Sequence, residues 1–376
     1  METFREDFFK SLDPIISDIL NKALEDREIS NRDAVELFKT KNLDFTAVEL
    51  VADWLRRKSV GDIVTFVVNR NINFTNICHM GCQFCAFSRK IDDSGTYLLS
   101  LEEIILKAKE AWKNGATEVC IQGGLHPKID AYHYKEILQA VKKNVPIHIH
   151  AFSPMEIVYG GSKSKLTVSE TLKMLKDAGL DSMPGTAAEI LVDEIRNEIC
   201  PKKINTDEWI NVVKTAHKLN IPTTSTILHG HIENVGHWVK HLSIIRDIQR
   251  ETKGFTEFVP LSFMHWHAPN YINGKTRPGA TGSEDMKMYA VSRIMLNKHL
   301  KNIQVSWVKI GVKMAQLALN TGANDFGGTL IEENISRSAG ATTPQYMQAE
   351  EIVRQIKNLG RTPAQRTTTY EIIKYN

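Results

Sequence analysis

Three cysteines that lie within eight residues of one another carry the clearest chemistry in this sequence. They are Cys78, Cys82 and Cys85, and their spacing is C-x3-C-x2-C. Cysteine thiolates are the usual protein ligands of iron–sulfur clusters. Three thiolates can bind three irons of a cubane and leave the fourth iron free for a substrate or cofactor, whereas four would make a closed electron carrier. The spacing therefore predicts a 4Fe–4S cluster with one open iron.

A zinc ion is the main alternative for these cysteines. Zinc sites normally have four ligands, and His79 is a nearby candidate, but its position next to Cys78 makes joint chelation awkward. A non-catalytic electron-transfer protein would need a fourth cluster ligand at suitable spacing. The other cysteines are Cys120, in an apolar stretch, and Cys200, at a predicted helix end, and we interpret both as free thiols.

Glycines and charged residues that follow other predicted strands could contact a ligand. Gly123 and Gly124, in the run QGGLHP, would let a ligand approach the backbone closely, although a tight turn would also explain them. Glu189 could hold ribose hydroxyls or could be an acid at a helix N-terminus. Lys203 could pair with a ligand carboxylate or remain solvated.

Several histidines and one aspartate also lie near strand ends. His148 and His150 alternate along one predicted strand, so they share a face, either as a hydrogen-bonded core pair or as a site pair. His231 and His265 follow later strands, and Asp325 lies on the last predicted strand. We interpret His150, His231, His265 and Asp325 as candidate substrate contacts, with zinc binding by the histidines as a second interpretation. The sequence identifies no catalytic acid or base.

These residues need a scaffold that brings strand ends together. From about residue 60, short apolar runs alternate with helical patterns, and the predicted strands are 64–68, 118–121, 147–152, 180–183, 223–228, 256–263, 303–308 and 324–326. Capping boxes at Ser100, Thr167 and Asn205 mark helix starts. Eight such units predict a closed (β/α)8 barrel, with an open doubly wound sheet as the alternative. In a barrel, the cysteine loop follows the first strand, on the face where active sites form.

The remaining sequence sets the expected domain organisation and excludes some classes of protein. We expect a helical N-terminal extension over residues 1–58, the barrel over 59–341 and a helical tail packed on the barrel over 342–376. The net charge of +3 argues against a dedicated nucleic-acid binder. No stretch approaches the 18 apolar residues of a membrane span, and residues 1–10 lack the features of a signal peptide. A cytoplasmic location is expected.

The cysteine loop resembles the signature of the radical S-adenosylmethionine (SAM) superfamily. Segments over about residues 50–370 are similar to the tyrosine-using subunit of FO synthase, the 5-amino-6-(D-ribitylamino)uracil–L-tyrosine 4-hydroxyphenyl transferase family of coenzyme F(420) biosynthesis. Aminofutalosine synthase and the dehypoxanthine futalosine cyclase of menaquinone synthesis share the cysteine loop. The segments that favour the FO synthase family are QGGLHP, HAFSPMEI and GANDFGGTL.

The resemblance implies two cofactors and a set of contacts to them. The open iron would chelate the amino and carboxylate groups of SAM, and the reduced cluster would cleave SAM to methionine and a 5′-deoxyadenosyl radical. Gly123 and Gly124 would meet the SAM amino group, Glu189 the ribose and Lys203 the carboxylate. The fold implied is a (β/α)8 TIM-type barrel of the radical SAM kind.

The resemblance also implies a reaction and partners. The radical would take a hydrogen from the amino group of L-tyrosine, and the Cα–Cβ bond would break to give 2-iminoacetate and a 4-hydroxybenzyl fragment. That fragment would join 5-amino-6-(D-ribitylamino)uracil. One cysteine loop implies a separate subunit, with the other FO synthase subunit needed for ring closure and a low-potential electron donor for the cluster. Neither nucleic acid nor membrane is an expected partner.

Overall fold

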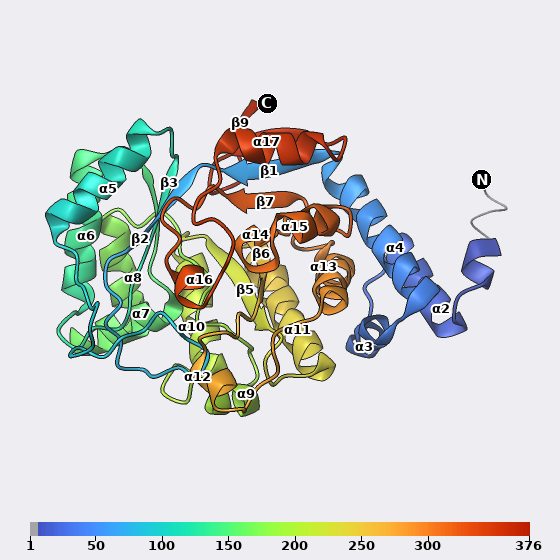
Figure 1. Cartoon of the computed structure of the whole chain (residues 1–376), viewed down its shortest axis with the longest axis horizontal. Coiled ribbons are helices and arrows are strands. Elements are labelled where there is room, and N and C mark those ends of the chain that lie inside the picture. The colour runs from blue at the N-terminus through green and yellow to red at the C-terminus, as the bar shows by residue number, and fades with distance from the viewer. Residues whose placement is uncertain (1–6) are drawn as a thin grey trace.

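The computed structural model describes residues 7–376, and a ring of strands surrounded by helices forms its centre (Figure 1). Residues 1–6 of the expected N-terminal extension lie outside the described residues. The strands are β1 Ile63–Val67, β2 Asn69–Asn73, β3 Glu118–Gln122, β4 His148–Ala151, β5 Thr223–His229, β6 Phe255–Ser262, β7 Asp325–Gly328, β8 Thr362–Arg366 and β9 Ile372–Tyr375. The helices are α2 Pro14–Leu24, α3 Asn31–Lys39, α4 Asn42–Val60, α5 Leu101–Lys113, α6 Ala131–Asn144, α7 Pro154–Lys163, α8 Val168–Asp177, α9 Asp193–Ile199, α10 Thr206–Lys218, α11 Val235–Thr252, α12 Pro269–Ile272, α13 Gly282–Leu296, α14 Trp307–Ile310, α15 Val312–Leu319, α16 Ile335–Ser338 and α17 Ala349–Lys357.

Parallel pairing closes the strands into a barrel. β2 pairs with β3, β3 with β4, β5 with β6 and β1 with β7. Isolated bridges complete the ring, and they join His150 to Ser182, Met183 to Thr223, Phe258 to Ile303 and Gln304 to Asp325. The predicted (β/α)8 barrel is confirmed. The open doubly wound alternative is wrong, because the first and last barrel strands, β1 and β7, are hydrogen-bonded to each other.

Three predicted strands differ from the observed elements, and one of them, 180–183, contributes only the bridge residues Ser182 and Met183. The first predicted strand, 64–68, corresponds to β1, and the chain continues through a short break into β2. The cysteine loop therefore follows β2. The run 303–308 contributes only bridge residues before the chain turns into α14. Trp307 explains the turn, because its buried indole N–H donates to the carbonyl oxygen of Gly328 at 2.9 Å. An apolar run alone does not distinguish a buried strand from a buried helical turn.

The predicted helix starts are confirmed at three places. α5, α8 and α10 begin with capping boxes whose N-cap residues are Ser100, Thr167 and Asn205. Each N-cap side chain accepts a hydrogen bond from a backbone N–H that the helix itself leaves unpaired. These caps fix where each helix leaves its loop, and therefore where the preceding strand ends relative to the site.

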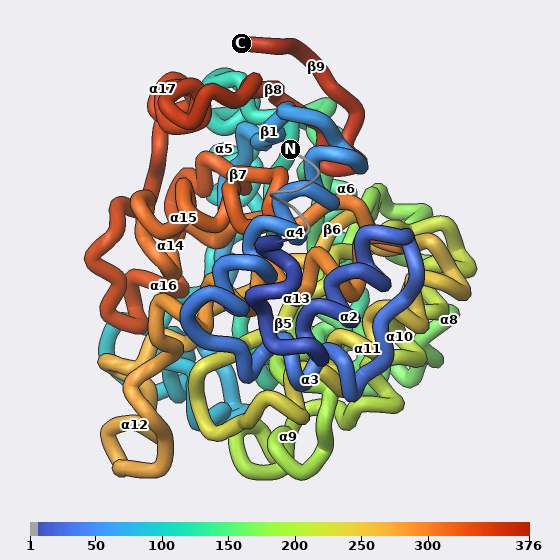
Figure 2. Tube along the Cα trace, turned by 90° about the vertical axis from the view of Figure 1, so that its right-hand side faces the viewer, coloured from blue at the N-terminus to red at the C-terminus, as the bar shows by residue number. Residues whose placement is uncertain are grey.

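The two ends of the chain pack on different parts of the strand ring. The N-terminal helices α3 and α4 contact α11 and α13, and Figure 2 shows them lying side by side over these helices. The C-terminal segment differs from the expected helical tail. Only α17 is helical there, and β8 then pairs parallel with β1 while β9 pairs antiparallel with β8. The polar residues of β8 favour this arrangement, because Arg366 finds buried carboxylate partners inside the barrel. The proposed boundaries at residues 58 and 341 stay predictions.

Across residues 7–376, the helices include none that combines the length and the apolar character needed to cross a bilayer.

Candidate active site

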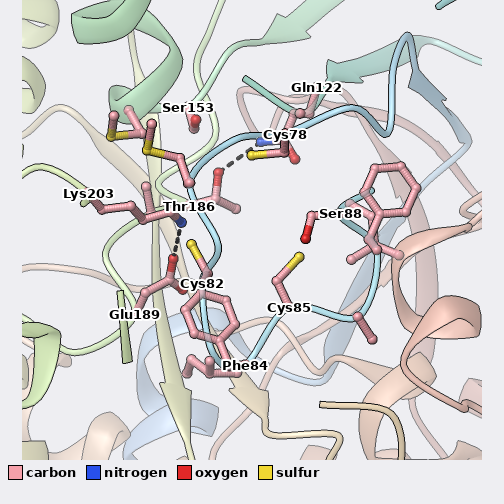
Figure 3. Close-up of a pocket in the computed structure, with 18 of the residues that line it drawn as sticks. Cys78, Cys82, Phe84, Cys85, Ser88, Gln122, Ser153, Thr186, Glu189 and Lys203 are labelled. Atoms are coloured by element: carbon pink, nitrogen blue, oxygen red, sulfur yellow. Dashed lines mark hydrogen bonds and ion pairs between the residues drawn. The ribbon is translucent and has the colours of Figure 1, made fainter. Parts of the chain in front are cut away.

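Cys78, Cys82 and Cys85 line one cavity, and Figure 3 shows their sulfur atoms directed at a common space. None of the three forms a disulfide. Backbone hydrogen bonds hold their loop, because the N–H of Cys78 donates to Arg89 O at 3.0 Å and that of Gln83 donates to Ile199 O at 2.8 Å. We call this space, of about 250 Å³, the cysteine cavity.

Gly123 and Gly124, which follow β3, also line the cysteine cavity. The N–H of Gly124 donates to Thr75 O at 2.8 Å, so the glycine turn lies directly against the start of the cysteine loop. A Cβ atom at Gly124 would collide with the carbonyl oxygen of Ile77, and one at Gly123 would collide with the ring of Phe74. Close packing, rather than an unusual backbone conformation, therefore requires glycine at both positions.

Lys203 and Glu189 meet in the cysteine cavity, where the Lys203 Nζ atom lies 2.6 Å from Glu189 Oε1 (Figure 3). Both side chains are largely buried. Burial opposes the charge on Lys203, but the Glu189 carboxylate and the neighbouring thiols raise its pKa above the ordinary value. The sequence placed these residues separately as ligand contacts. The structure brings them together as an ion pair at the cavity wall.

Glu156 is a cavity residue that the sequence analysis did not single out. It is buried on α7, and its carboxylate accepts hydrogen bonds from the N–H of Gly123 at 3.0 Å and from the N–H and hydroxyl of Ser153 at 2.7 Å each. Burial raises the pKa of Glu156 to about 7. The Ser153–Glu156 capping box was a signal in the sequence that could have identified it.

Replacement of Glu156 by glutamine is expected to remove a pH-dependent cost to folding. Because burial raises the folded-state pKa of Glu156 from 4.5 to about 7, this carboxyl costs nothing below pH 4.5 and costs most above pH 7. We expect the free energy of unfolding of wild type, relative to Glu156→Gln, to fall by about 3 kcal/mol across that interval. Urea unfolding at a series of pH values measures it.

The matched control for this prediction is Glu170→Gln. Glu170 has the same capping-box role on α8 but is exposed, and its hydrogen bonds to Thr167 lower its pKa. The stabilising effect of Glu170 is therefore lost as the pH falls. The pH dependence of stability is thus opposite in sign to that expected for Glu156. Parallel pH profiles for wild type and Glu156→Gln would contradict the assignment of Glu156.

Apolar side chains form much of the remaining wall of the cysteine cavity. They come from the cysteine loop, from α7 and from the ends of β5 and β6, and they include Met80, Phe84, Phe87, Met155, Leu228, Leu261 and Phe263. Such a lining limits the access of water and offers an aromatic ring favourable contacts. The cavity thus combines thiols, one ion pair, one buried carboxyl and an apolar wall.

Two of the four expected substrate contacts, His150 and His231, are bonded to other protein groups outside the cysteine cavity. The rings of His148 and His150 both hydrogen-bond the Ser182 hydroxyl at 2.7 Å, which is the core-pair interpretation of the alternation. His231 is buried, and its Nδ1 atom lies 2.9 Å from a Glu233 carboxylate oxygen. Neither His150 nor His231 lines the cysteine cavity.

The other two expected contacts also lie outside the cysteine cavity. The ring of His265 stacks on Trp266 with 4.4 Å between centroids. Asp325 is fully buried and paired with Arg366. It is the first residue of β7, at the N-terminal end of the strand, whereas barrel active sites form at the C-terminal ends. The structure therefore gives no support to these four residues as substrate contacts in this cavity.

Comparison with known proteins defines the class and the family. Residues 72–245 match the radical SAM superfamily, and residues 252–376 match the CofH/MqnC C-terminal region. The barrel and its cysteine loop therefore define an enzyme of the radical SAM superfamily, which implies a 4Fe–4S cluster and SAM as cofactors. Within that superfamily, the chain belongs to the family of 5-amino-6-(D-ribitylamino)uracil–L-tyrosine 4-hydroxyphenyl transferases.

Two relatives that bear this family name are similar over almost their whole length. The protein from Methanocaldococcus jannaschii is 59% identical over 353 residues, which cover 93% of this chain and 98% of the relative. The protein from Methanothermobacter thermautotrophicus is 52% identical and covers 95% and 97% respectively.

Solved structures that resemble this barrel share the fold at low sequence identity. Methylornithine synthase (PylB) has a TM-score of 0.73 at 19% identity, over 92% of this chain and 97% of that one. The hydrogenase maturase HydG from Carboxydothermus hydrogenoformans has a TM-score of 0.73 at 18% identity, over 94% and 80%.

Proposed function

We propose that this chain cleaves the Cα–Cβ bond of L-tyrosine and joins the 4-hydroxybenzyl fragment to 5-amino-6-(D-ribitylamino)uracil. The observation that carries the proposal is the near full-length similarity to relatives named for this transfer, at 59% identity for the first. The three thiols of this chain that surround one cavity also support the proposal. The products are the precursor of the FO ring system, 2-iminoacetate, methionine and 5′-deoxyadenosine, which carries the hydrogen taken from tyrosine.

Cys78, Cys82 and Cys85 are the proposed ligands of the cluster, with one iron left open to SAM. Together the bound cluster and SAM supply a 5′-deoxyadenosyl radical. The arrangement of the thiols fits a multi-iron body, because they surround a shared space while no three His, Cys, Asp or Glu side chains in residues 7–376 lie close enough for one metal ion. Burial raises the pKa of Cys82 to about 12, and coordination would deprotonate it.

Four residues of the cysteine cavity are the proposed contacts to SAM. Gly123 and Gly124 line the cavity beside the cysteine loop, where an amino group could approach the backbone. The Lys203 ammonium offers a donor to a carboxylate, and Glu189 offers an acceptor to ribose hydroxyls. Because these two now bond each other, SAM binding would exchange part of that ion pair for ligand contacts.

The other cavity residues position the substrate and protect the reaction. The apolar wall gives an aromatic side chain a surface to pack on, and it keeps water from a reactive fragment. Glu156 fixes the glycine turn through its bond to the Gly123 N–H. The chain works with the second FO synthase subunit, which closes the ring, and with a low-potential electron donor, which reduces the cluster. The proposed location is the cytoplasm.

Substrate dependence of SAM cleavage tests the proposed function. Cluster-loaded enzyme is incubated without oxygen with SAM and a strong reductant, and 5′-deoxyadenosine is quantified by liquid chromatography. We expect its formation to depend on L-tyrosine and to be coupled to loss of the diaminouracil. Turnover of a futalosine-type substrate in place of tyrosine would contradict the proposal.

A further inference from the structure

A second cavity adjoins the cysteine cavity and has a more polar lining. We call it the polar cavity, and it lies between the segment that follows β2 and the segment that follows β7. Its volume is about 570 Å³, within the range of roughly 300–1,000 Å³ that small-molecule sites occupy. Its lining includes Asn73, Arg89, Tyr97, Lys107 and Ser338. Amides, cations and hydroxyls of this kind bind polar ligands rather than an aromatic hydrocarbon ring.

The two cavities are neighbours that share wall residues. Asn73 and Phe87 line both of them. The short helix α16 separates them elsewhere, because Ile335 lines the cysteine cavity and Ser338 lines the polar cavity. A molecule in one cavity therefore lies next to a molecule in the other.

Two polar groups of the polar cavity lack protein partners among the described residues, and a third forms no ion pair, whereas Lys107 pairs with Glu332 and the Ser338 hydroxyl donates to Asn334 O. Asn73 is buried, and its Oδ1 atom has no hydrogen-bond donor in the described part of the chain. The Tyr97 hydroxyl makes no hydrogen bond to any residue in 7–376, although burial and the nearby Glu332 carboxylate raise its pKa to about 12. Arg89 donates only to backbone carbonyls, and its guanidinium forms no ion pair within the same range. A buried acceptor without a partner costs stability, which a bound ligand would recover.

The lining of the cysteine cavity suits some components of the reaction better than others. Its apolar wall suits the ring of tyrosine, and its ion pair and glycine turn suit SAM. A molecule with a ribityl chain and a diaminouracil ring needs many more hydrogen bonds than that wall offers.

We propose that the polar cavity binds the polyhydroxylated diaminouracil, with its ring at the Asn73 junction and its hydroxyl chain toward Tyr97 and Ser338. This assignment rests on the proposed function, and it adds the location of the acceptor substrate. The Asn73 Oδ1 atom accepts from a ring N–H or amino group. The Tyr97 hydroxyl and the Arg89 guanidinium bond the hydroxyl chain. The junction places the acceptor ring beside the space where tyrosine is cleaved.

Direct binding to the cluster-loaded enzyme tests the assignment without turnover. Equilibrium dialysis of 5-amino-6-(D-ribitylamino)uracil is done without oxygen and with SAM, and no reductant is added. Tyr97→Phe removes one hydroxyl that has no protein partner, so we expect Kd for the diaminouracil to rise about fivefold. Asn73→Ala is expected to raise it about tenfold by removing the junction acceptor. The matched control Tyr132→Phe changes an exposed tyrosine on α6 and leaves Kd unchanged.

Each outcome bears on the assignment. Unchanged Kd in both Tyr97→Phe and Asn73→Ala would overturn it, and so would a higher KM for tyrosine in Tyr97→Phe at constant Kd for the diaminouracil. Failure of wild type to bind the diaminouracil would also overturn it. The proposed function fails separately, if wild type binds the diaminouracil through these residues yet forms no 5′-deoxyadenosine with tyrosine.

Discussion

Replacing Cys82 with alanine is expected to abolish 5′-deoxyadenosine formation, and Cys78→Ala and Cys85→Ala are expected to do the same. The cluster and SAM supply the radical chemistry, and the side chains of the protein cannot supply it in their place. Loss of a cluster ligand therefore removes the activity. The three cysteines act as one unit, and we expect a loss of about 10³-fold or more for each single variant and no further loss in the triple variant. Chromatographic quantification of 5′-deoxyadenosine, together with iron and sulfide content, measures both effects.

Cys120→Ala is the matched control for the cysteine variants. Cys120 lies on β3 and does not line the cysteine cavity. Its replacement should leave iron content and SAM cleavage near wild type. Circular dichroism of each variant separates loss of the cluster from loss of the fold. Survival of SAM cleavage in a folded Cys82→Ala variant would contradict the ligand assignment.

Replacing Arg366 with methionine is expected to give the largest loss of stability. Its guanidinium lies inside the barrel, where Nη2 is 3.1 Å from Asp325 Oδ1 and 3.1 Å from Glu257 Oε2. Removing the cation leaves two buried carboxyls that keep hydrogen bonds from Thr65, Gly327 and Tyr370 but lose their cationic partner, which costs about 3–5 kcal/mol. Burial already raises the pKa of Glu257 to about 7, so protonation relieves part of this cost as the pH falls. Urea unfolding at pH 8 and pH 5 measures both effects.

Arg354→Met provides the comparison for Arg366→Met. Arg354 pairs with Glu351 on the surface of α17, where ion pairs contribute about 0–1 kcal/mol. An Arg366→Met protein as stable as Arg354→Met at pH 8 would contradict a structural role for the buried pair. The same reasoning assigns Asp325 to stability, so Asp325→Asn should lower the unfolding midpoint and leave the KM for tyrosine unchanged in the folded fraction.

The cysteine loop and the barrel could be predicted because their signals are local. Cluster ligands lie within one loop, and alternation of strands and capped helices requires no knowledge of distant contacts. Lys203 and Glu189 were candidates because Glu189 follows a predicted strand and Lys203 precedes a predicted helix, and because the family resemblance implies that both contact SAM. The ion pair between them could not be predicted from the sequence, because it depends on how two loops meet in space.

The four expected substrate contacts stay predictions, and the structure places them outside the cysteine cavity because the direction of a side chain matters as much as its position. Alternation places His148 and His150 on one face, but it does not say that Ser182 lies opposite that face. The last strand was predicted at 324–326 and is observed at Asp325–Gly328, so Asp325 lies at the start of the strand rather than in its middle. The polar cavity had no sequence signal, because Asn73 and Ser338 come from segments far apart in the chain.

Transfer of a labelled ring tests the central claim most directly. Enzyme with a reduced cluster, SAM and the diaminouracil is given L-tyrosine carrying carbon-13 only in its ring, and the products are analysed by mass spectrometry. The account predicts that the label appears in a uracil product whose mass includes the 4-hydroxybenzyl group, while glyoxylate from 2-iminoacetate stays unlabelled. Cleavage of SAM with the ring label retained in tyrosine would contradict it.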